Sequence, residues 1–265
     1  MNGVCCLTVA GSDCGGNAGV QADLRTFRSY GIHGCTVFTA LTAQNPFGVS
    51  GILDVGADFI GKQLDAVLGV YDIRAVKTGM MSSAEAIRAV SGRLSSRPGI
   101  PIVVDPVMVA TSGADLMAKG ALEAAEKELF PIAALLTPNI PEAETISGRT
   151  PGAVAHPDRD YAERLALEIS DRFGIAVLVK GGHGAESEST DVLACGGGTA
   201  SFSLPWIKNP VSTHGTGCTL SSAIACELAL GRNLEEAVSN AKKYVHDAIA
   251  KSYLVGKNCG VLGNG

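Results

Sequence analysis

Short runs of β-branched and other apolar residues alternate along this chain with longer segments in which apolar residues recur every three or four positions. The runs that indicate strands are residues 4–10, 35–42, 73–77, 100–105, 134–137 and 176–180. Strands that alternate with helices in this way usually pair in parallel. The pattern therefore predicts an α/β protein with a largely parallel sheet wrapped by helices.

Start and end signals mark several of the helical segments. Val20, Leu24 and Phe27 share one face of a helix that ends before Gly31. The sequence Ser-Ser-Ala-Glu at 82–85 is typical of a capping box ahead of a second apolar stripe. Two later helices are predicted from the spacing of four at Tyr161, Leu165, Ile169 and Phe173, and from the cap signal Asn233 with Glu236.

Two segments interrupt the alternation of strands and helices. Within residues 186–205, the stretches 191–195 and 199–204 flank Gly196-Gly197-Gly198, which predicts a hairpin at the sheet edge. Residues 148–159 are polar and predict a surface loop, and the glycine-rich residues 256–265 are expected to be loose. With no linker or internal repeat, residues 1–265 are expected to form a single domain.

Composition narrows the functional classes. The chain has 265 residues, 46% hydrophobic content, 33 glycines and a formal charge of −5, with no long basic run, which argues against a broad nucleic-acid surface. Its eight cysteines form no C-x-x-C pair and mostly lie in apolar runs, as expected for reduced thiols in a cytoplasmic protein. The apolar N-terminal segment is too short to span a membrane and lacks a basic leader, so no membrane partner is expected.

A glycine-punctuated turn, His-Gly-Thr-Gly-Cys-Thr at 214–219, runs directly into an apolar helix pattern. The first amides of a helix lack intrahelical partners and carry the positive end of its dipole. Glycine allows an anion to approach the backbone closely, and Thr216 and Thr219 add hydroxyl groups. The turn therefore indicates an anion site, with ordinary strand-to-helix geometry as the alternative, and Cys218 is the first side chain available to the anion.

Polar residues follow several predicted strands. Asp105 ends one strand, Asn139 and Glu142 follow the next, and Lys180 ends a third. Ligands of parallel sheets gather at these carboxyl ends, where carboxylates suit Mg²⁺ with a polyphosphate and a lysine suits phosphate. Considered alone, Asp105 or Glu142 would be interpreted as a helix cap, and Lys180 as a lysine that faces solvent. Together with the anion site, they favour phosphoryl transfer.

The first predicted strand leads into a loop with four glycines, at residues 10–19. Its spacing matches neither G-x-G-x-x-G nor the P-loop, so neither phosphate-binding mechanism applies. The same mismatch argues against a nicotinamide dehydrogenase. A loop wrapped around a small ligand and a flexible turn capped by Asp13 both remain open.

The residues in these segments also match a known family. The chain resembles the hydroxymethylpyrimidine/phosphomethylpyrimidine kinases of thiamin biosynthesis, which belong to the ribokinase-like superfamily. The resemblance spans nearly the whole chain and rests on short blocks in a fixed order: Ala10-Gly11-Ser12-Asp13, Gln21-Ala22-Asp23-Leu24, Thr42-Ala43-Gln44-Asn45, Val76-Lys77-Thr78-Gly79-Met80, Val104-Asp105-Pro106-Val107-Met108, Thr137-Pro138-Asn139-Ile140-Pro141-Glu142-Ala143-Glu144, Val179-Lys180-Gly181-Gly182-His183 and His214-Gly215-Thr216-Gly217-Cys218-Thr219.

The resemblance implies a ribokinase-like three-layer α/β/α sandwich with a mostly parallel central sheet and a small edge hairpin. It implies ATP-dependent phosphorylation of 4-amino-5-hydroxymethyl-2-methylpyrimidine and of its monophosphate, with ATP and Mg²⁺ as cofactors. A cytoplasmic homodimer is also expected from the family. The alternatives are a pyridoxal or pyridoxine kinase of the same lineage, and a non-catalytic pyrimidine-binding protein that keeps the fold.

The resemblance also implies roles for individual residues. Gln44 is expected to hydrogen-bond the aminopyrimidine ring, because an amide offers both a donor and an acceptor. The other implied residues are Gly11, Ala18, Asp23, Met80 and Val107 in the substrate wall, Asn139, Lys180 and Thr213 in the ATP site, Asp105 and Glu142 at Mg²⁺, and Gly215, Thr216, Gly217 and Cys218 at the reacting centre.

A few positions depart from the wider pattern. Cys218 stands where the superfamily carries an Asp that acts as base, a substitution typical of the pyrimidine kinases. A helix N-terminus is expected to lower the pKa of this thiol. Cys14 and Asn17 in the first glycine loop, Pro46-Phe47 and the tail at 258–262 are unusual for the family.

Overall fold

The computed structural model describes residues 3–109, 113, 116–181 and 188–264. Within this part of the chain, one sheet contains nine strands in the order β3-β2-β1-β4-β5-β6-β7-β8-β9. Their bounds are β1 (Cys5–Asp13), β2 (His33–Asn45), β3 (Gly48–Asp54), β4 (Ile73–Thr78), β5 (Ile102–Val104), β6 (Leu135–Leu136), β7 (Ala176–Gly181), β8 (Glu188–Cys195) and β9 (Gly198–Pro205). The strands predicted from the apolar runs are all present.

The centre of the sheet is parallel and both of its edges are antiparallel. Neighbouring strands from β2 through β1, β4, β5 and β6 to β7 pair in parallel. At one edge β8 and β9 form the predicted hairpin, and at the other β3 pairs antiparallel with β2. Strand β3 was not predicted. Gly182 and His183 of the motif after β7 lie outside the described residues.

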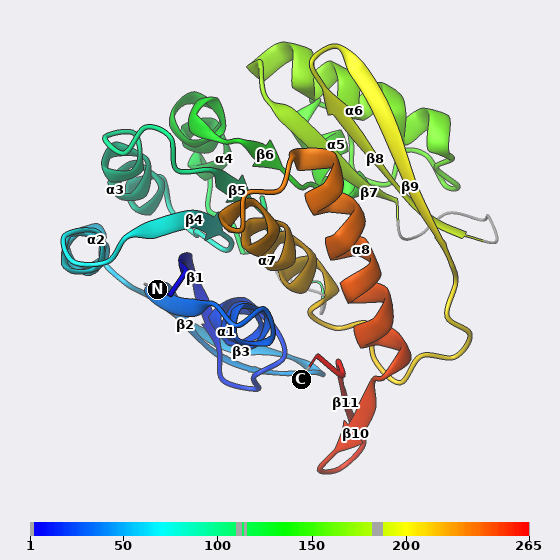
Figure 1. The fold of residues 1–265 in the computed structure, drawn as a ribbon, viewed down its shortest axis with the longest axis horizontal. Helices are drawn as coiled ribbons and strands as arrows, with labels where there is room; N and C mark the ends of the chain where they lie inside the picture. Colours follow the sequence, from blue (N-terminus) through cyan, green and yellow to red (C-terminus); the bar gives the residue numbers. More distant parts are fainter. Residues whose placement is uncertain (1–2, 110–112, 114–115, 182–187, 265) are drawn as a thin grey trace.

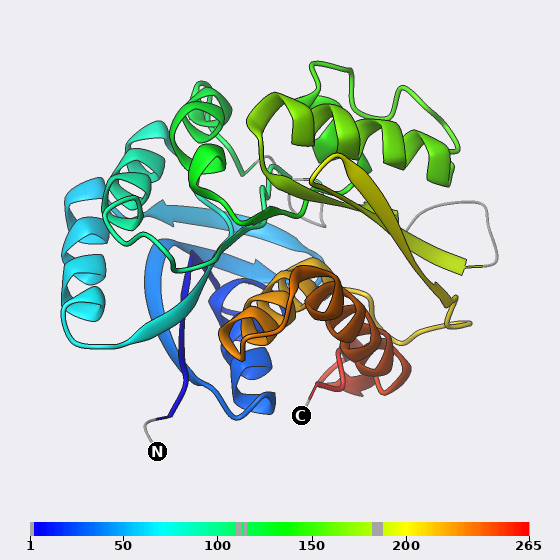
Figure 2. The ribbon, with the colours of Figure 1, turned by 45° about the horizontal axis from the view of Figure 1, so that its top comes forward.

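Helices cover both faces of the sheet (Figures 1 and 2), which confirms the predicted three-layer arrangement. On one face lie α1 (Gly19–Ser29), α7 (Thr216–Ala229) and α8 (Leu234–Ala250). The other face carries α2 (Ala57–Leu68), α3 (Ala84–Leu94), α4 (Ala121–Ala124), η1 (Ala125–Leu129), η2 (Phe130–Ile132), α5 (Ile140–Ile146) and α6 (Arg159–Phe173).

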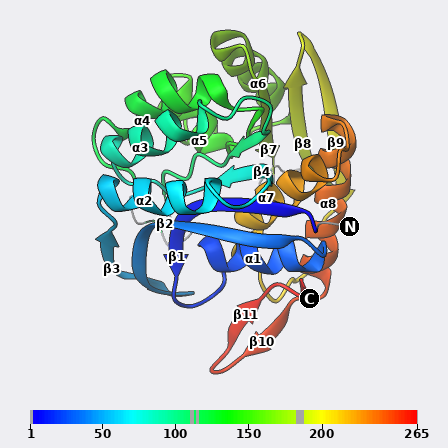
Figure 3. The same ribbon diagram turned by 60° about the vertical axis from the view of Figure 1, so that its left-hand side comes forward.

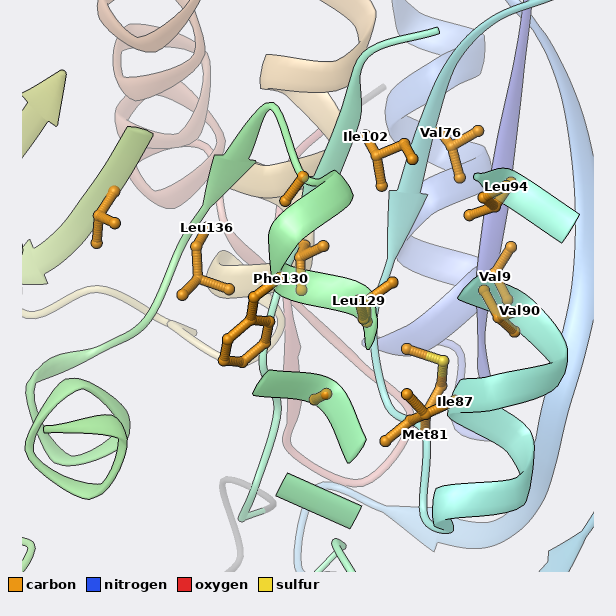
Figure 4. Close-up of a cluster of buried hydrophobic side chains, with 14 of the residues drawn as sticks. Val9, Val76, Met81, Ile87, Val90, Leu94, Ile102, Leu129, Phe130 and Leu136 are labelled. Atoms are coloured by element: carbon orange, nitrogen blue, oxygen red, sulfur yellow. The ribbon is translucent and has the colours of Figure 1, made fainter. Parts of the chain in front are cut away.

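Alternation along the strands divides the core between these two faces. On β1, Cys5 and Leu7 pack with the cluster that contains α3, whereas Cys6 between them packs with Phe27 of α1. Figure 4 shows the first cluster, in which strand residues such as Val76 meet Ile87, Val90 and Leu94 of α3. The buried central strands are apolar on both sides because helices cover both faces.

Helix ends follow the local signals with one exception. Asn233 caps α8 by accepting a hydrogen bond from the amide of Glu236, as predicted. The predicted capping box at 82–85 is wrong, because Ser83 is the N-cap of α3 and accepts from the amide of Ala86. Ser82 instead donates to the carboxylate of Asp54. Ser82, which the local pattern assigned to the cap, thus forms its hydrogen bond with a residue that is distant in the sequence.

The C-terminal segment was predicted to be loose, and this prediction is wrong. Strands β10 (Tyr253–Val255) and β11 (Cys259–Val261) form an antiparallel hairpin that lies beyond the C-terminal end of α8 in Figures 1 and 3. Leu262 is 5% exposed, and the amide of Gly263 donates to the carbonyl of Ala248 at 2.9 Å. A Cβ at Gly260 would lie 2.3 Å from the Val211 carbonyl oxygen, so this glycine permits close packing.

Other expectations from the sequence can also be compared with the structure. Residues 148–158 form an exposed connection between α5 and α6, as predicted. All eight cysteines carry free thiols. Among the described residues, no helix combines the length and the apolar character needed to cross a membrane.

A substitution tests whether the tail is anchored. We expect Leu262→Ala to lower the free energy of unfolding by about 2–3 kcal/mol, because it removes a buried side chain and leaves a cavity. Leu254→Ala is the matched control, since Leu254 is 58% exposed, and its effect is expected to stay within about 0.5 kcal/mol. Urea unfolding followed by circular dichroism measures both, and equal small effects would indicate a loose tail.

Candidate active site

A cavity of about 770 Å³ lies where the central strands end and α7 begins. Thr219, which the sequence offered as a hydroxyl group at the anion site, is fully buried and does not line the cavity. Of the residues that the family resemblance assigned to the site, all but Asp23 line it: Gly11, Ala18, Gln44, Met80, Asp105, Val107, Asn139, Glu142, Lys180, Thr213, Gly215, Thr216, Gly217 and Cys218. The parallel pairing explains this meeting, because the carboxyl ends of β1, β4, β5, β6 and β7 all lie at the same edge of the sheet.

The glycine turn before α7 is held by close backbone packing. Gly215 is the N-cap of α7 and has φ +86°, and a Cβ there would lie 2.0 Å from the carbonyl oxygen of Asn17. The turn therefore rests directly on the first glycine loop. The geometry of a helix start leaves the amides of Gly217 and Cys218 without intrahelical acceptors. These amides lie at the positive end of a 14-residue helix, which is an arrangement that binds anions.

Lys180 and Asp105 form a pair beside this turn. The Lys180 Nζ lies 2.8 Å from Asp105 Oδ1, and Ser221 of α7 donates to Asp105 Oδ2 at 3.3 Å. A Cβ on Gly217 would lie 3.5 Å from the Lys180 Nζ and 3.9 Å from Asp105 Oδ2. The ammonium group and the free amides thus face the same end of the cavity.

The charges at this end shift one another's ionisation. Burial opposes the ionisation of Asp105, but the ammonium groups of Lys180 and Lys77 hold its pKa below the ordinary value. Burial also disfavours the charged form of Lys180, and the neighbouring Asp105 and Glu142 keep its pKa raised. Burial raises the pKa of Glu142 to about 7, and the nearby Asp105 adds to this effect.

Asn139 and Glu142 form a capping box at the start of α5. The Asn139 side chain accepts from the Glu142 amide at 2.9 Å, and Glu142 Oε2 accepts from the Asn139 amide at 2.8 Å. The alternative interpretation of an acid as part of a helix cap is therefore correct for Glu142, and both Asn139 and Glu142 also line the cavity. Carboxylate oxygens of Asp105 and Glu142 on one cavity wall fit Mg²⁺, which takes one or two carboxylates and completes its shell with water and phosphate.

Gln44, Met80, Val107, Gly11 and Ala18 form another part of the cavity lining. Val107 packs against the buried cluster that contains Met80, and a Cβ on Gly11 would lie 3.0 Å from the Met80 sulfur. The Gln44 side-chain oxygen accepts from the Thr42 hydroxyl at 3.3 Å. This part of the lining thus combines an apolar wall with an amide that is both a donor and an acceptor, which suits a small heteroaromatic ring.

The first glycine loop is organised by Asp13 rather than being a flexible turn. Its carboxylate oxygens accept hydrogen bonds from the amides of Gly15, Asn17 and Ala18 at 2.8–2.9 Å. Cys14 ties the loop to the end of β2, because its sulfur accepts from the Gln44 amide at 3.2 Å and donates to the Gln44 carbonyl at 3.1 Å. The two unusual residues of this loop, Cys14 and Asn17, thus contact the backbone at the two ends of the cavity.

Asp23 does not line the cavity, in contrast to the expected role. It is fully buried, and both of its carboxylate oxygens lie 2.9 Å from the Nζ of Lys77. Thr8 of β1 and Ser222 of α7 also donate to this carboxylate. It is Lys77 that reaches the cavity wall. No role was expected for Lys77, although a lysine within an apolar strand is rarely buried without a partner and could have indicated one.

Cys218 has a different protonation state from the expected one. Burial raises the pKa of its thiol to about 11, although the ammonium group of Lys77 opposes the shift. The expectation of a lowered pKa is therefore wrong, because the effect of burial outweighs that of the lysine. At neutral pH the residue is a thiol that faces the cavity.

A second buried ion pair lies on the same cavity and was also missed. Lys242 of α8 lies 2.8 Å from Asp191 of β8, and the other oxygen of Asp191 accepts from the Gly181 amide at 3.1 Å. Both side chains line the cavity, together with Trp206 and His246. The pair joins α8 to the end of β7, directly after Lys180. Its partners are 51 positions apart in the sequence, so no local pattern identifies it.

Several known proteins are similar to this chain over most of its length. A family model described as phosphomethylpyrimidine kinase matches residues 13–263. A hydroxymethylpyrimidine/phosphomethylpyrimidine kinase of Rhizobium meliloti is 47% identical over 92% of this chain and 90% of its own length. The thiamine biosynthesis bifunctional protein ThiED of Geobacter sulfurreducens is 46% identical over 96% of this chain, which corresponds to 51% of that longer protein.

Solved structures show the same fold. The phosphomethylpyrimidine kinase of Clostridium difficile 630 superposes with a TM-score of 0.79 at 41% identity and covers 93% of this chain and 99% of its own. The pyridoxal kinase of Staphylococcus aureus in complex with ADP has a TM-score of 0.89 at 30% identity and covers 100% and 94%. The family match across most of the sequence, together with the cavity residues described above, shows that this chain belongs to the phosphomethylpyrimidine kinase family.

Proposed function

We propose that this protein uses ATP to phosphorylate 4-amino-5-hydroxymethyl-2-methylpyrimidine, and then its monophosphate, in thiamin biosynthesis. One observation carries the proposal: a single cavity is lined both by the Gln44 amide with an apolar wall and by Gly217 and Cys218 of the α7 turn with Lys180. The names of relatives with up to 47% identity agree with this activity.

In this proposal the pyrimidine lies against Met80 and Val107, and the Gln44 amide pairs with a ring nitrogen and the exocyclic amine. This pose directs the 5-hydroxymethyl group toward the α7 turn. The amides of Gly217 and Cys218 and the Lys180 ammonium then stabilise the charge that develops on the transferred phosphoryl group. Because such a transition state is loose, positioning contributes more than a strong base, and the Cys218 thiol serves as a neutral neighbour of the reacting oxygen.

Asp105 and Glu142 are the residues that would hold Mg²⁺, with Asn139 fixing the Glu142 carboxylate through the capping box. When bound there with ATP, the ion would neutralise phosphate charge and orient the phosphates. The nucleotide is proposed to extend past Thr213 toward the Lys242–Asp191 pair. Complexes of a related pyridoxal kinase with ADP and AMP-PCP support the use of a nucleotide by this fold.

A pyridoxal kinase activity is the second candidate, because pyridoxal kinases are among the structural neighbours with TM-scores of 0.87–0.89. Their identity to this chain is 29–30%, whereas the phosphomethylpyrimidine kinase structure reaches 41%. Pyridoxal and the pyrimidine are both planar rings that carry a hydroxymethyl group. We therefore propose pyridoxal only as a secondary substrate.

Three broader expectations also stay proposals. We propose that residues 1–265 act as one catalytic domain, that the protein is a homodimer and that it works in the cytoplasm. The continuous sheet from β3 to β9 supports the first, because the cavity takes residues from both halves of the chain. Sedimentation would test the second.

The proposed activity is tested by steady-state kinetics with both alcohols and Mg·ATP. We expect kcat/KM for the aminopyrimidine to exceed that for pyridoxal by at least about 10-fold, because only the pyrimidine offers the paired donor and acceptor that match Gln44. Mass spectrometry of the products would identify the monophosphate and the pyrophosphate. A preference for pyridoxal would contradict the proposal.

Substitutions in the substrate part and in the phosphate part of the cavity are expected to change different kinetic constants. Gln44→Leu should raise KM for the pyrimidine by about 10- to 100-fold and leave KM for ATP nearly unchanged, because it removes hydrogen bonds to the ring only. Lys180→Met is the matched variant in the phosphate part, and it should lower kcat by about 100-fold or more. If Gln44→Leu changed both KM values equally, the assigned orientation of the substrate would be wrong.

The protonation state of Cys218 predicts its reactivity. Because burial raises the pKa of this thiol to about 11, its alkylation by iodoacetamide should accelerate by about 10-fold per pH unit from about pH 7 to 10. In the urea-unfolded chain, the alkylation rate of the same thiol should level off above its ordinary pKa of about 8.5. Mass spectrometry of the Cys218 peptide reports both rates, and a plateau near neutral pH in the folded protein would show a thiolate.

A further inference from the structure

The end of the sheet opposite the cavity carries a cluster of metal-ligating groups. The sulfurs of Cys5 and Cys35 and a ring nitrogen of His33 all lie within 4.8 Å of one another. Cys5 begins β1, and His33 and Cys35 lie at the start of β2. Within the described residues, no other group of three or more histidine, cysteine or acidic side chains converges in this way. Cavity residues come from the opposite, carboxyl ends of the strands, so the cluster belongs to a separate place in the fold.

The pairing of β1 with β2 explains why the three side chains converge. In the parallel ladder Cys5 is the partner of His33, and Leu7 is the partner of Cys35. Side chains two residues apart on a strand point to the same face, so His33 and Cys35 project on the same side of β2. Cys5 and Cys35 both belong to the hydrophobic cluster under α2 and α3, which places the two thiols on that face as well.

The distances match those of a tetrahedral thiolate site. The two sulfurs are 3.5 Å apart. When Zn²⁺ is bound tetrahedrally with Zn–S bonds of about 2.3 Å, two sulfur ligands lie about 3.8 Å apart. A shift of a few tenths of an ångström therefore suffices to admit the ion. Two thiolates and a neutral imidazole would bring the net charge of such a site to zero, which lowers the cost of placing an ion among apolar residues.

The access of solvent to the cluster and the orientation of the His33 ring also favour metal binding. Both thiols are buried, whereas His33 is exposed and gives a route from solvent. The His33 ring stacks on Tyr71 with centroids 5.6 Å apart and an interplanar angle of 17°, and its amide donates to the Val4 carbonyl at 2.9 Å. The Asp72 carboxylate lies close enough to Cys5 to interact with it electrostatically. The imidazole is thus held beside the sulfurs, in a region of added negative charge.

We propose that Cys5, His33 and Cys35 bind a thiophilic divalent metal ion, with Zn²⁺ as the best match to two sulfurs and one nitrogen. The ion replaces the two thiol protons, which pass to solvent, and three protein ligands leave a fourth position for water. Bound there, it ties the start of β1 to the start of β2. The proposal does not depend on the kinase activity, because none of the three residues lines the cavity.

Cobalt titration tests the proposal, since a Co²⁺–thiolate bond gives a charge-transfer band in the near ultraviolet that oxygen and nitrogen ligands do not give. We expect the purified, metal-free protein to develop this band with one Co²⁺ per chain and to lose it when one equivalent of Zn²⁺ is added. Cys5→Ser and Cys35→Ser should each abolish or strongly weaken the band. Cys195→Ser is the matched control, because Cys195 is an exposed thiol on β8, and it should leave the band unchanged.

The histidine ligand is tested by His33→Phe, which keeps an aromatic ring against Tyr71. Loss of a direct ligand should weaken metal binding by at least the roughly 10- to 100-fold that loss of an outer-shell partner costs. His156→Phe, in the exposed loop before α6, is its control and should bind as the unchanged protein does. Kinase activity with Mg·ATP should be retained in all five variants, which shows that they are folded.

Several results would overturn the proposal. One is the absence of a charge-transfer band in the unchanged protein, in which case the two thiols serve only as small buried apolar groups. Another is a band that persists in both Cys5→Ser and Cys35→Ser. A Cys5–Cys35 disulfide in protein purified with reductant would also exclude the site. Failure of the kinase assay alone would not, because that result bears on the proposed function and not on the metal.

Discussion

The buried ion pair between Lys77 and Asp23 is the interaction on which the geometry of the cavity depends. Neither side chain has any exposed surface, so each charge requires its partner and full hydrogen bonding. Asp23 lies on α1 and Lys77 on β4, and the hydroxyl groups of Thr8 and Ser222 add β1 and α7 to the same network. Loss of one partner from such a pair typically costs about 3–5 kcal/mol, so these four elements are held in one relative position.

The fixed position matters because the same elements carry both ends of the cavity. Gly11 follows the central part of β1, Ala18 precedes α1, Met80 follows β4 and Cys218 opens α7. The ammonium group of Lys77 also acts on its surroundings, since it favours the ionised form of Asp105 and opposes the burial effect on Cys218. With Lys180 it supplies two ammonium groups near the α7 turn, each paired with a carboxylate, and a polyphosphate ligand can interact with such groups.

Sequence patterns predicted the features that depend on local periodicity and failed where distant partners decide. Strands β1, β2, β4 and β7 follow from apolar runs, and parallel pairing brings the polar residues after them to one edge, which is why nearly all predicted site residues share a cavity. Residues 256–265 were wrongly expected to be loose because a high glycine content suggests a flexible backbone, whereas Gly260 packs against the Val211 carbonyl. Asp23 lies outside the lining because it pairs with Lys77, which is 54 positions away in the sequence. The Cys218 pKa was misjudged because the burial that raises it depends on tertiary packing.

Parallel pairing also explains why two unrelated kinds of chemistry fit on one pair of strands. It places the carboxyl ends of β1 and β2 on the cavity, where Gly11 and Gln44 face the proposed substrate. The amino ends lie a strand length away, where no step of the phosphoryl transfer constrains the side chains. Residues such as Cys5 and His33 are therefore free to acquire another role there. A metal ion at that end would strengthen the β1–β2 pairing, and thereby the arrangement that places Gly11 and Gln44 on one cavity, without contacting any group that takes part in catalysis.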